Sequence, residues 1–171
     1  MNDFVHPCLD FRFVPFTMEY GQEICHWQYE PPYDLYNWGA WETLEAAGDE
    51  FADPYIRETQ FSGVLDENGR LIGFVQFFPI VGVTRLGLGL RPDLCGSGNG
   101  ATFAQACAEE ALRRKPLDAV DLEVLVWNDR ARKAYERAGF RITDRYERKM
   151  PDGMGDFFCM EYICEKDVES P

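Results

Sequence analysis

A glycine-rich loop between a predicted strand and a predicted helix constrains the fold of this chain most. The strand covers residues 86–90 and stops at Pro92, which has no N–H group to donate to a sheet ladder. Three glycines then occupy alternate positions at the start of a helix that extends to Arg114: Gly96, Gly98 and Gly100. Glycine N–H groups can approach an anion closely, and the helix adds the positive end of its dipole. The loop therefore predicts a phosphate site, with a flexible turn that only caps the helix as the alternative.

Length and composition indicate a globular protein. The 171 residues are 46% hydrophobic and 15% aromatic, so we expect one domain over 1–171, with a core at 9–165 and a frayed tail at 166–171. No run of about 18 residues is apolar and uncharged, and the N-terminus lacks the features of a signal peptide. The six cysteines lack metal-ligand spacing. We therefore expect a cytoplasmic protein with reduced thiols and no metal.

The chain is strongly acidic. Its formal net charge is −13, from 30 acidic and 17 basic residues. Such a field repels nucleic acid and anionic membranes and favours cationic partners. We therefore expect neither nucleic acid nor a membrane as a partner, although an acidic surface is also a common solution to solubility.

An aromatic segment covers residues 27–41. Six large rings fall between residues 27 and 41, interrupted by Pro31-Pro32: Trp27, Tyr29, Tyr33, Tyr36, Trp38 and Trp41. Because rings and carboxylates together attract cations, the segment predicts a cage for an amine. The candidate substrate-binding residues are Trp27, Glu30, Tyr33 and Asp34. The alternative is that these rings only pack an irregular helix pair onto a sheet, and both interpretations can hold at once.

The rest of the chain alternates strands and helices. Strands are predicted at 9–15, 61–66, 70–80, 119–127, 140–149 and 154–165, and helices at 100–114 and 130–138. Asn68-Gly69 between apolar runs predicts a hairpin, and Gly139 predicts the end of the second helix. A hairpin followed by strand–helix–strand–helix indicates an α+β (mixed α/β) fold, with a mixed central sheet of about six or seven strands and helices on both faces.

Two blocks, separated by one predicted helix and one predicted strand, carry a family resemblance. The first is Leu90-Arg91-Pro92 followed by Gly96-Ser97-Gly98-Asn99-Gly100-Ala101. The second runs from Asn128 through Tyr135 to Gly139-Phe140, with the spacing Asn-x6-Tyr-x3-Gly-Phe. Together they resemble the acetyl-CoA pyrophosphate loop and the following signature of the GCN5-related N-acetyltransferase (GNAT) superfamily. The resemblance implies a three-layer fold with splayed central strands and acetyl-CoA as co-substrate, and leaves a homodimer open.

The resemblance also implies which residues contact the cofactor. The loop amides would bind the pyrophosphate, the edge of the strand before them the pantetheine arm, and one asparagine side chain the coenzyme. The loop residues are Gly96, Ser97, Gly98, Asn99, Gly100 and Ala101. The strand-edge residues are Leu88, Gly89 and Leu90. The asparagine is Asn128, which is alternatively a helix cap. The family usually has Gln or Arg where Cys95 stands, and often basic residues at Ser97 and Asn99. Cys95 is therefore interpreted as a small filler, and phosphate binding is expected to rely on backbone amides, with help from Arg91, Arg130 or Arg132.

Acetyl transfer to an amine needs a base, because an alkyl amine has a pKa of about 10.4, and an acid for the leaving thiolate. Tyr135 matches the family tyrosine that protonates the coenzyme sulfur. Glu123 is the candidate base, because its spacing to Asn128 and Tyr135 resembles that of ribosomal-protein alanine acetyltransferases. The alternatives are a solvated or ion-paired Glu123, a Tyr135 that only packs in the core, and Asp121 or Asp93 as weaker bases.

Two rival functions need weighing. Gly96-x-Gly98-x-x-Ala101 also fits a dinucleotide-binding fingerprint, but that fingerprint follows its strand directly at the head of a βαβ unit. Here Pro92 intervenes and other structure precedes the loop, so we reject it. A catalytically idle acyl-CoA sensor on the same fold remains the alternative to an enzyme. The acceptor also stays open, whether a peptide α-amine, a polyamine, an amino sugar or a small toxic amine, and so does an acyl group other than acetyl.

Overall fold

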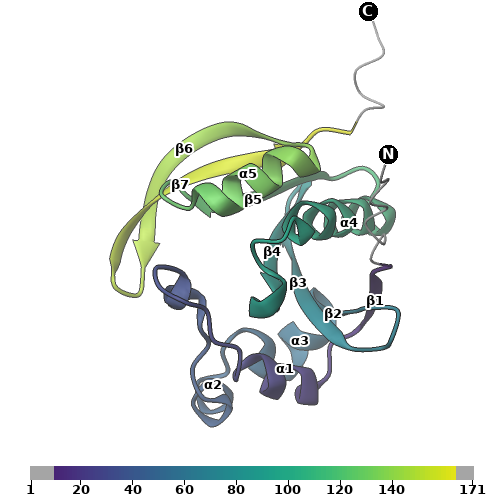
Figure 1. Ribbon diagram of the computed structural model, residues 1–171, viewed down its shortest axis with the longest axis vertical. Coiled ribbons are helices and arrows are strands. Elements are labelled where there is room, and N and C mark those ends of the chain that lie inside the picture. The colour runs from purple at the N-terminus through teal and green to yellow at the C-terminus, as the bar shows by residue number, and fades with distance from the viewer. Residues whose placement is uncertain (1–9, 165–171) are drawn as a thin grey trace, which may run out of the picture.

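The computed structural model describes residues 10–164 and contains one sheet of seven strands (Figure 1). The strands are β1 (Arg12–Pro15), β2 (Phe61–Leu65), β3 (Leu71–Ile80), β4 (Val83–Leu90), β5 (Ala119–Leu125), β6 (Phe140–Met150) and β7 (Gly153–Tyr162). Their order across the sheet is β1-β2-β3-β4-β5-β7-β6. The predicted mixed sheet of six or seven strands is therefore confirmed, although the first strand begins at Arg12, and position 9 and the predicted tail at 166–171 lie outside the described residues.

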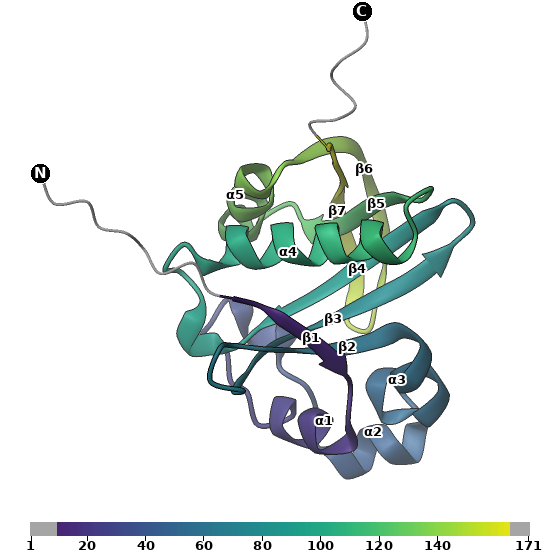
Figure 2. The same ribbon diagram turned by 90° about the vertical axis from the view of Figure 1, so that its right-hand side faces the viewer.

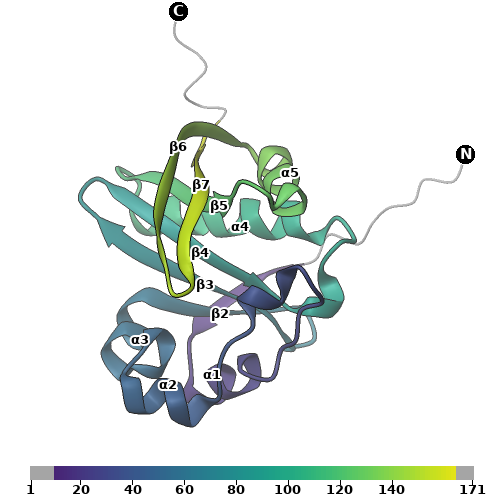
Figure 3. The ribbon, with the colours of Figure 1, turned by 90° about the vertical axis from the view of Figure 1, so that its left-hand side faces the viewer.

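Helices cover both faces of the sheet, as predicted. The α-helices are α1 (Met18–Ile24), α2 (Trp41–Ala47), α3 (Pro54–Gln60), α4 (Asn99–Arg114) and α5 (Asp129–Ala138). Three short 3₁₀ turns connect them: η1 (Tyr33–Tyr36), η2 (Glu50–Ala52) and η3 (Pro92–Leu94). Figures 2 and 3 show α4 and α5 on one face and α1 to α3 on the other. None of the helices in the described part of the chain is long and apolar enough to cross a membrane.

The two central parallel strands separate halfway along their length. β4 and β5 pair only from Val83 opposite Ala119 to Leu86 opposite Leu122, yet β4 continues to Leu90 and β5 to Leu125. Every other neighbouring pair in the sheet is antiparallel. Beyond Leu86 the inner edge of β4 therefore has no strand to pair with, and its backbone groups face the opening.

Two hydrophobic cores lie on the two faces of the sheet. One contains the inward set of β5, Val120, Leu122 and Val124, with the apolar residues of α4. The other is aromatic and lies among α1, α2, η2 and the first strands, where Phe51 is completely buried. Trp27 and Trp41 are both buried in this second core. These two rings of the aromatic segment therefore pack against the sheet, as the alternative interpretation predicted.

Gly89 lets β4 approach the aromatic core closely, since a Cβ at this position would overlap the ring of Phe74. We expect Gly89→Ala to lower the free energy of unfolding by about 1–3 kcal/mol, the usual cost of forcing an extra carbon into a packed interior. Urea unfolding measures this loss. Gly39→Ala is the matched control, because a Cβ there meets nothing within 4 Å. Equal free energies of unfolding for the two variants would show that β4 shifts to accommodate the extra carbon without loss of stability.

Candidate active site

A cavity of about 620 Å³ lies where β4 and β5 separate. Its walls are the ends of these strands, the glycine loop with the start of α4, one side of α5, and the aromatic segment before α2. The predicted cofactor-binding and catalytic residues that line it are Leu88, Gly89, Leu90, Gly96, Gly98, Gly100, Ala101, Glu123, Asn128 and Tyr135. Ser97 and Asn99 neighbour these glycines in the chain but do not line the cavity.

The glycine loop has the geometry of an anion site. Gly96 and Gly98 have φ values of 79° and 82°, a left-handed conformation that favours glycine. Gly98 is the N-cap of α4, and no side chain caps the first-turn N–H groups of this helix within the described residues. The Asn99 side chain donates to the Leu94 carbonyl at 3.2 Å and so holds the loop closed. Uncapped N–H groups at the positive end of a long helix fit a pyrophosphate.

The free edge of β4 is partly occupied by the protein itself. The Leu90 carbonyl accepts a hydrogen bond from the Tyr29 hydroxyl at 2.7 Å and a weaker one from the Cys95 thiol at 3.7 Å. Burial raises the pKa of that thiol, which agrees with the interpretation of Cys95 as a filler rather than a nucleophile. The edge from Gly87 to Gly89 is therefore the part that remains for a ligand's amides.

Asn128 caps α5 and also binds a tyrosine. Its Oδ1 accepts from the Ala131 N–H at 3.1 Å, and its Nδ2 donates to the Tyr36 hydroxyl at 3.0 Å. Asn128 is only 5% exposed. Asn128 therefore has its alternative role as the N-cap of α5. Its side-chain amide, predicted to contact the coenzyme, already donates to Tyr36. A strap formed by residues 29–36 therefore spans the cavity, tied to β4 through Tyr29 and to α5 through Tyr36.

The structure does not assemble the four residues of the predicted amine cage. Trp27 is buried in the aromatic core against Phe74, and Asp34 is exposed and does not line the cavity. Glu30 lies in a separate hollow of about 320 Å³ beside it. Only Tyr33 lines the main cavity, where the Arg130 guanidinium stacks 3.7 Å from its ring centre. Tyr29 and Tyr36, which the sequence marked only as aromatic, line it as well.

Tyr135 lies in the wall of the cavity with its ring 6.0 Å from that of Phe140. Burial raises the pKa of Tyr135, so the hydroxyl keeps its proton. Within residues 10–164 this hydroxyl makes no hydrogen bond, which leaves it available to a ligand. Both interpretations from the sequence fit this position, since the ring packs against the core and the hydroxyl can donate.

Glu123 lies in a network of charged and polar side chains from β4, β5 and β6. Its Oε2 accepts from the Tyr146 hydroxyl at 2.6 Å and pairs with the Arg148 Nε at 3.2 Å, while its Oε1 is 3.5 Å from an Arg85 nitrogen. Arg85 also holds Asp121 through two bonds of 2.9 Å, and Asp121 does not line the cavity. The ion-paired alternative for Glu123 is thus present, and within the described residues the contact of Oε1 is the longer one of 3.5 Å to Arg85. Of the two carboxylates, only Glu123 can contact a ligand in the cavity.

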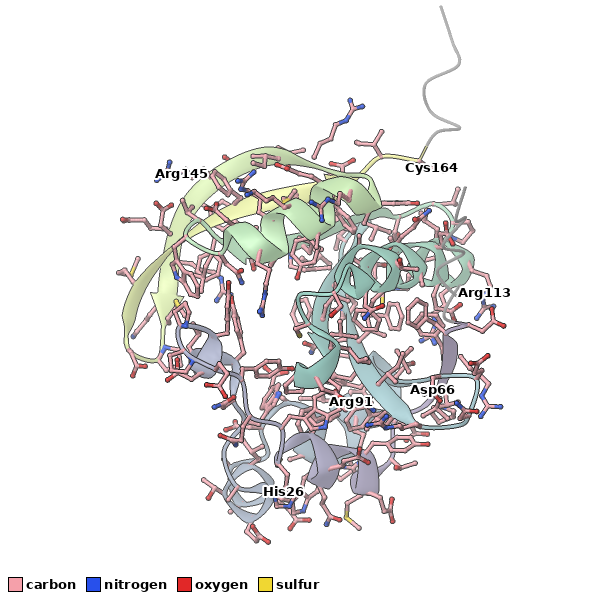
Figure 4. The ribbon with its side chains drawn as sticks, in the orientation of Figure 1. His26, Asp66, Arg91, Arg113, Arg145 and Cys164 are labelled. Carbon is pink, nitrogen blue, oxygen red and sulfur yellow. The ribbon has the colours of Figure 1, made fainter. Side chains whose placement is uncertain are left out.

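Of the three arginines that the sequence suggested for phosphate binding, Arg130 lines the cavity, whereas Arg91 and Arg132 do not. Arg91 binds Asp93 and the Leu71 carbonyl, and Arg132 pairs with Asp129 and Glu136, so both guanidinium groups are occupied. Figure 4 shows Arg91 beside η3 and His26 on the helical side below, neither lining the cavity. The cations of α5 that do line it are Arg130, Lys133 and Arg137. Their spacing of three and four residues puts them on one helix face, and Lys133 and Arg137 are the two that the sequence analysis did not name although this spacing was present in the sequence.

The family and the fold are established by comparison. The model of the acetyltransferase (GNAT) family matches residues 18–140. A chimera of the Vibrio cholerae spermidine N-acetyltransferase SpeG with hSSAT is 18% identical, with a TM-score of 0.70 over 95% of this chain and 99% of that one. The Vibrio cholerae enzyme in complex with CoA and spermine is also 18% identical, with a TM-score of 0.63 over 90% and 94%. A Bacillus anthracis GNAT-family acetyltransferase is 14% identical, with a TM-score of 0.55 over 66% and 72%. The chain belongs to the GNAT acetyltransferase family, whose acyl donor is acetyl-CoA.

Proposed function

We propose that this protein transfers the acetyl group of acetyl-CoA directly to a primary amine of a cationic acceptor, as an acyl-CoA N-acyltransferase. The observation that carries the proposal is the cavity itself. It joins the N-terminus of α4 to the Tyr135 hydroxyl across the gap between β4 and β5, and within the described residues neither group has a side-chain partner. A pyrophosphate bound at one end would leave a thioester near the other.

The chain's own groups fit the coenzyme along the length of the cavity. The N–H groups at 98–101 would bind the pyrophosphate, and Arg130, Lys133 and Arg137 would add positive charge beside it. The free edge at 87–89 would take the pantetheine amides as an added strand does. Acetyl-CoA supplies an activated thioester; every proton that moves must be handled by the protein.

Two side chains are proposed to handle these protons. The acceptor amine must lose a proton before it attacks, and Glu123 would take it at Oε1, directly or through water, with the carboxylate oriented by Tyr146 and Arg148. As the C–N bond forms and the C–S bond breaks, Tyr135 would give its proton to the sulfur. A main-chain N–H near Leu88 would bind the acyl oxygen.

The acceptor is proposed to be a small cationic amine. The net charge of −13 favours a cation, and SpeG, whose fold this chain shares, is named as a spermidine N-acetyltransferase. A peptide amine is the less favoured acceptor. We also propose that the protein is a single domain over 1–171, that it is cytoplasmic, and that it can form a homodimer.

A screen of amines for coenzyme A release tests the function. We expect release of the thiol from acetyl-CoA with at least one diamine or polyamine. The idle sensor is the second candidate, favoured by the pairing of Glu123 with two arginines. Acetyl-CoA binding by calorimetry without thiol release from any amine would support the sensor.

Replacement of Glu123 by glutamine tests the base. We expect Glu123→Gln to lower kcat about a hundred-fold or more, the usual contribution of a general base, while acetyl-CoA binds as before. Asp121→Asn is the comparison, since it also removes a carboxylate from Arg85 but lies outside the cavity. Stopped-flow turnover and thermal unfolding of both variants separate chemistry from stability. A matching loss of kcat in the two would mean that the network only holds the strands together.

A further inference from the structure

The cavity contains a second carboxylate, Glu50, that the proposed chemistry does not use. Glu50 and Glu123 are the carboxylates that line the cavity within the described residues. Glu123 is neutralised by Arg85 and Arg148. Glu50 has no ion pair in residues 10–164, and its only polar side-chain contact there is with the Gln76 Nε2 at 3.3 Å. It is therefore the carboxylate of the cavity whose negative charge is left uncompensated.

The backbone at Glu50 is held in an unfavourable conformation. Its φ of 47° is the only positive value for a non-glycine residue in the described part of the chain. The next two residues, Phe51 and Ala52, are buried, and the Arg57 guanidinium donates to both of their carbonyls at 2.9 and 3.2 Å. Glycine would adopt this φ without cost. The presence of glutamate at such a position indicates that its side chain is needed there.

The Gln76 amide contacts the Glu50 carboxylate without neutralising it. The Gln76 Nε2 also donates to the Gln60 Oε1 at 2.9 Å, so this amide is fixed between β3 and the end of α3. Trp38, Phe61 and Phe74 line the same cavity. A carboxylate in a cavity with aromatic walls is an environment that attracts an alkylammonium group.

We infer that Glu50 binds a second, protonated amino group of the acceptor, so that the acceptor is an aliphatic diamine or polyamine. The inference rests on the proposed function, because an amine that attacks must be neutral and cannot itself remain the ammonium partner of a carboxylate. One amino group then loses its proton on the Glu123 side while another stays charged on Glu50. A monoamine of the same length lacks the second group.

Calorimetric binding of cadaverine and pentylamine to the full chain with coenzyme A present tests the inference. The two probes have the same carbon chain and differ in one amino group. We expect the wild-type protein to bind cadaverine about three- to fivefold more tightly, the effect of one ion pair at an exposed carboxylate. Glu50→Gln should remove that advantage, with a larger loss of affinity for cadaverine than for pentylamine. Glu45→Gln, an exposed carboxylate of α2 that does not line the cavity, is the charge-matched control and should keep the advantage.

The outcomes separate this inference from the proposed function. Wild-type protein that binds both probes equally, a Glu50→Gln variant that keeps the preference for cadaverine, or an equal loss for both probes would overturn the role of Glu50. Glu50→Gly, which relieves the strained φ, should fold at least as stably as wild type and still lose the preference. If the preference behaves as expected but no amine releases coenzyme A, the role of Glu50 stands and acetyl transfer fails.

Discussion

Replacing Tyr135 by phenylalanine is expected to lower kcat about a hundred- to ten-thousand-fold, the range that a positioned general acid contributes. The ring is retained, so its packing beside Phe140 should survive, and only the proton donor is lost. Acetyl-CoA affinity is therefore expected to stay within about twofold of wild type, because the loop amides that would bind the pyrophosphate are untouched. Single-turnover thiol release and calorimetry measure the two quantities. Tyr55→Phe, an exposed tyrosine of α3 outside the cavity, is the matched control.

The pH dependence gives a second test of the same residue. Burial raises the pKa of Tyr135, so its protonated, donating form persists to higher pH than for an exposed tyrosine. Activity should therefore show no loss from this acid up to a pH of about 10, the ordinary tyrosine value. A rise of activity with pH would report the base instead. If Tyr135→Phe keeps kcat within about threefold of Tyr55→Phe, the hydroxyl is not the acid and the ring is only a core aromatic.

The local motifs predicted most of the fold around the cavity. The spacing of Asn128, Tyr135 and Gly139 belongs to one helix and its two ends, so short-range geometry alone fixes where these residues lie. Asn128 caps α5, and Gly139 ends it with a φ of 109°. The glycine loop and the uncapped start of α4 follow in the same way from residues that are neighbours in the chain.

The acceptor side of the cavity could not be predicted because it depends on contacts between distant segments. Trp27 appeared as a cage residue, yet a large ring gains more by burial in a core than at an open site, and it lies there. Glu50 gave no signal, since neither its strained φ nor the 26-residue separation from its partner Gln76 can be read from a pattern.

Phe51 packs the aromatic core against the acceptor side of the cavity. It is fully buried, and its ring lies within about 6.5 Å of five others: Phe16, Trp38, Trp41, Phe61 and Phe74. Three of these five, Trp38, Phe61 and Phe74, also line the cavity. Loss of the ring should therefore weaken the fold and the cavity wall together.

We expect Phe51→Ala to lower the free energy of unfolding by about 3–5 kcal/mol, because it removes a buried ring and leaves a void that rigid aromatic neighbours cannot fill. Urea unfolding followed by tryptophan fluorescence measures the loss, since Trp38 and Trp41 report on this core. Phe78→Ala, at a ring that is 46% exposed, is the control and should cost no more than about 1 kcal/mol. A loss below about 1 kcal/mol for Phe51→Ala would mean that the helices around η2 collapse onto the void. In that case Glu50 would not be held by its neighbour, and its left-handed backbone would relax with the collapse.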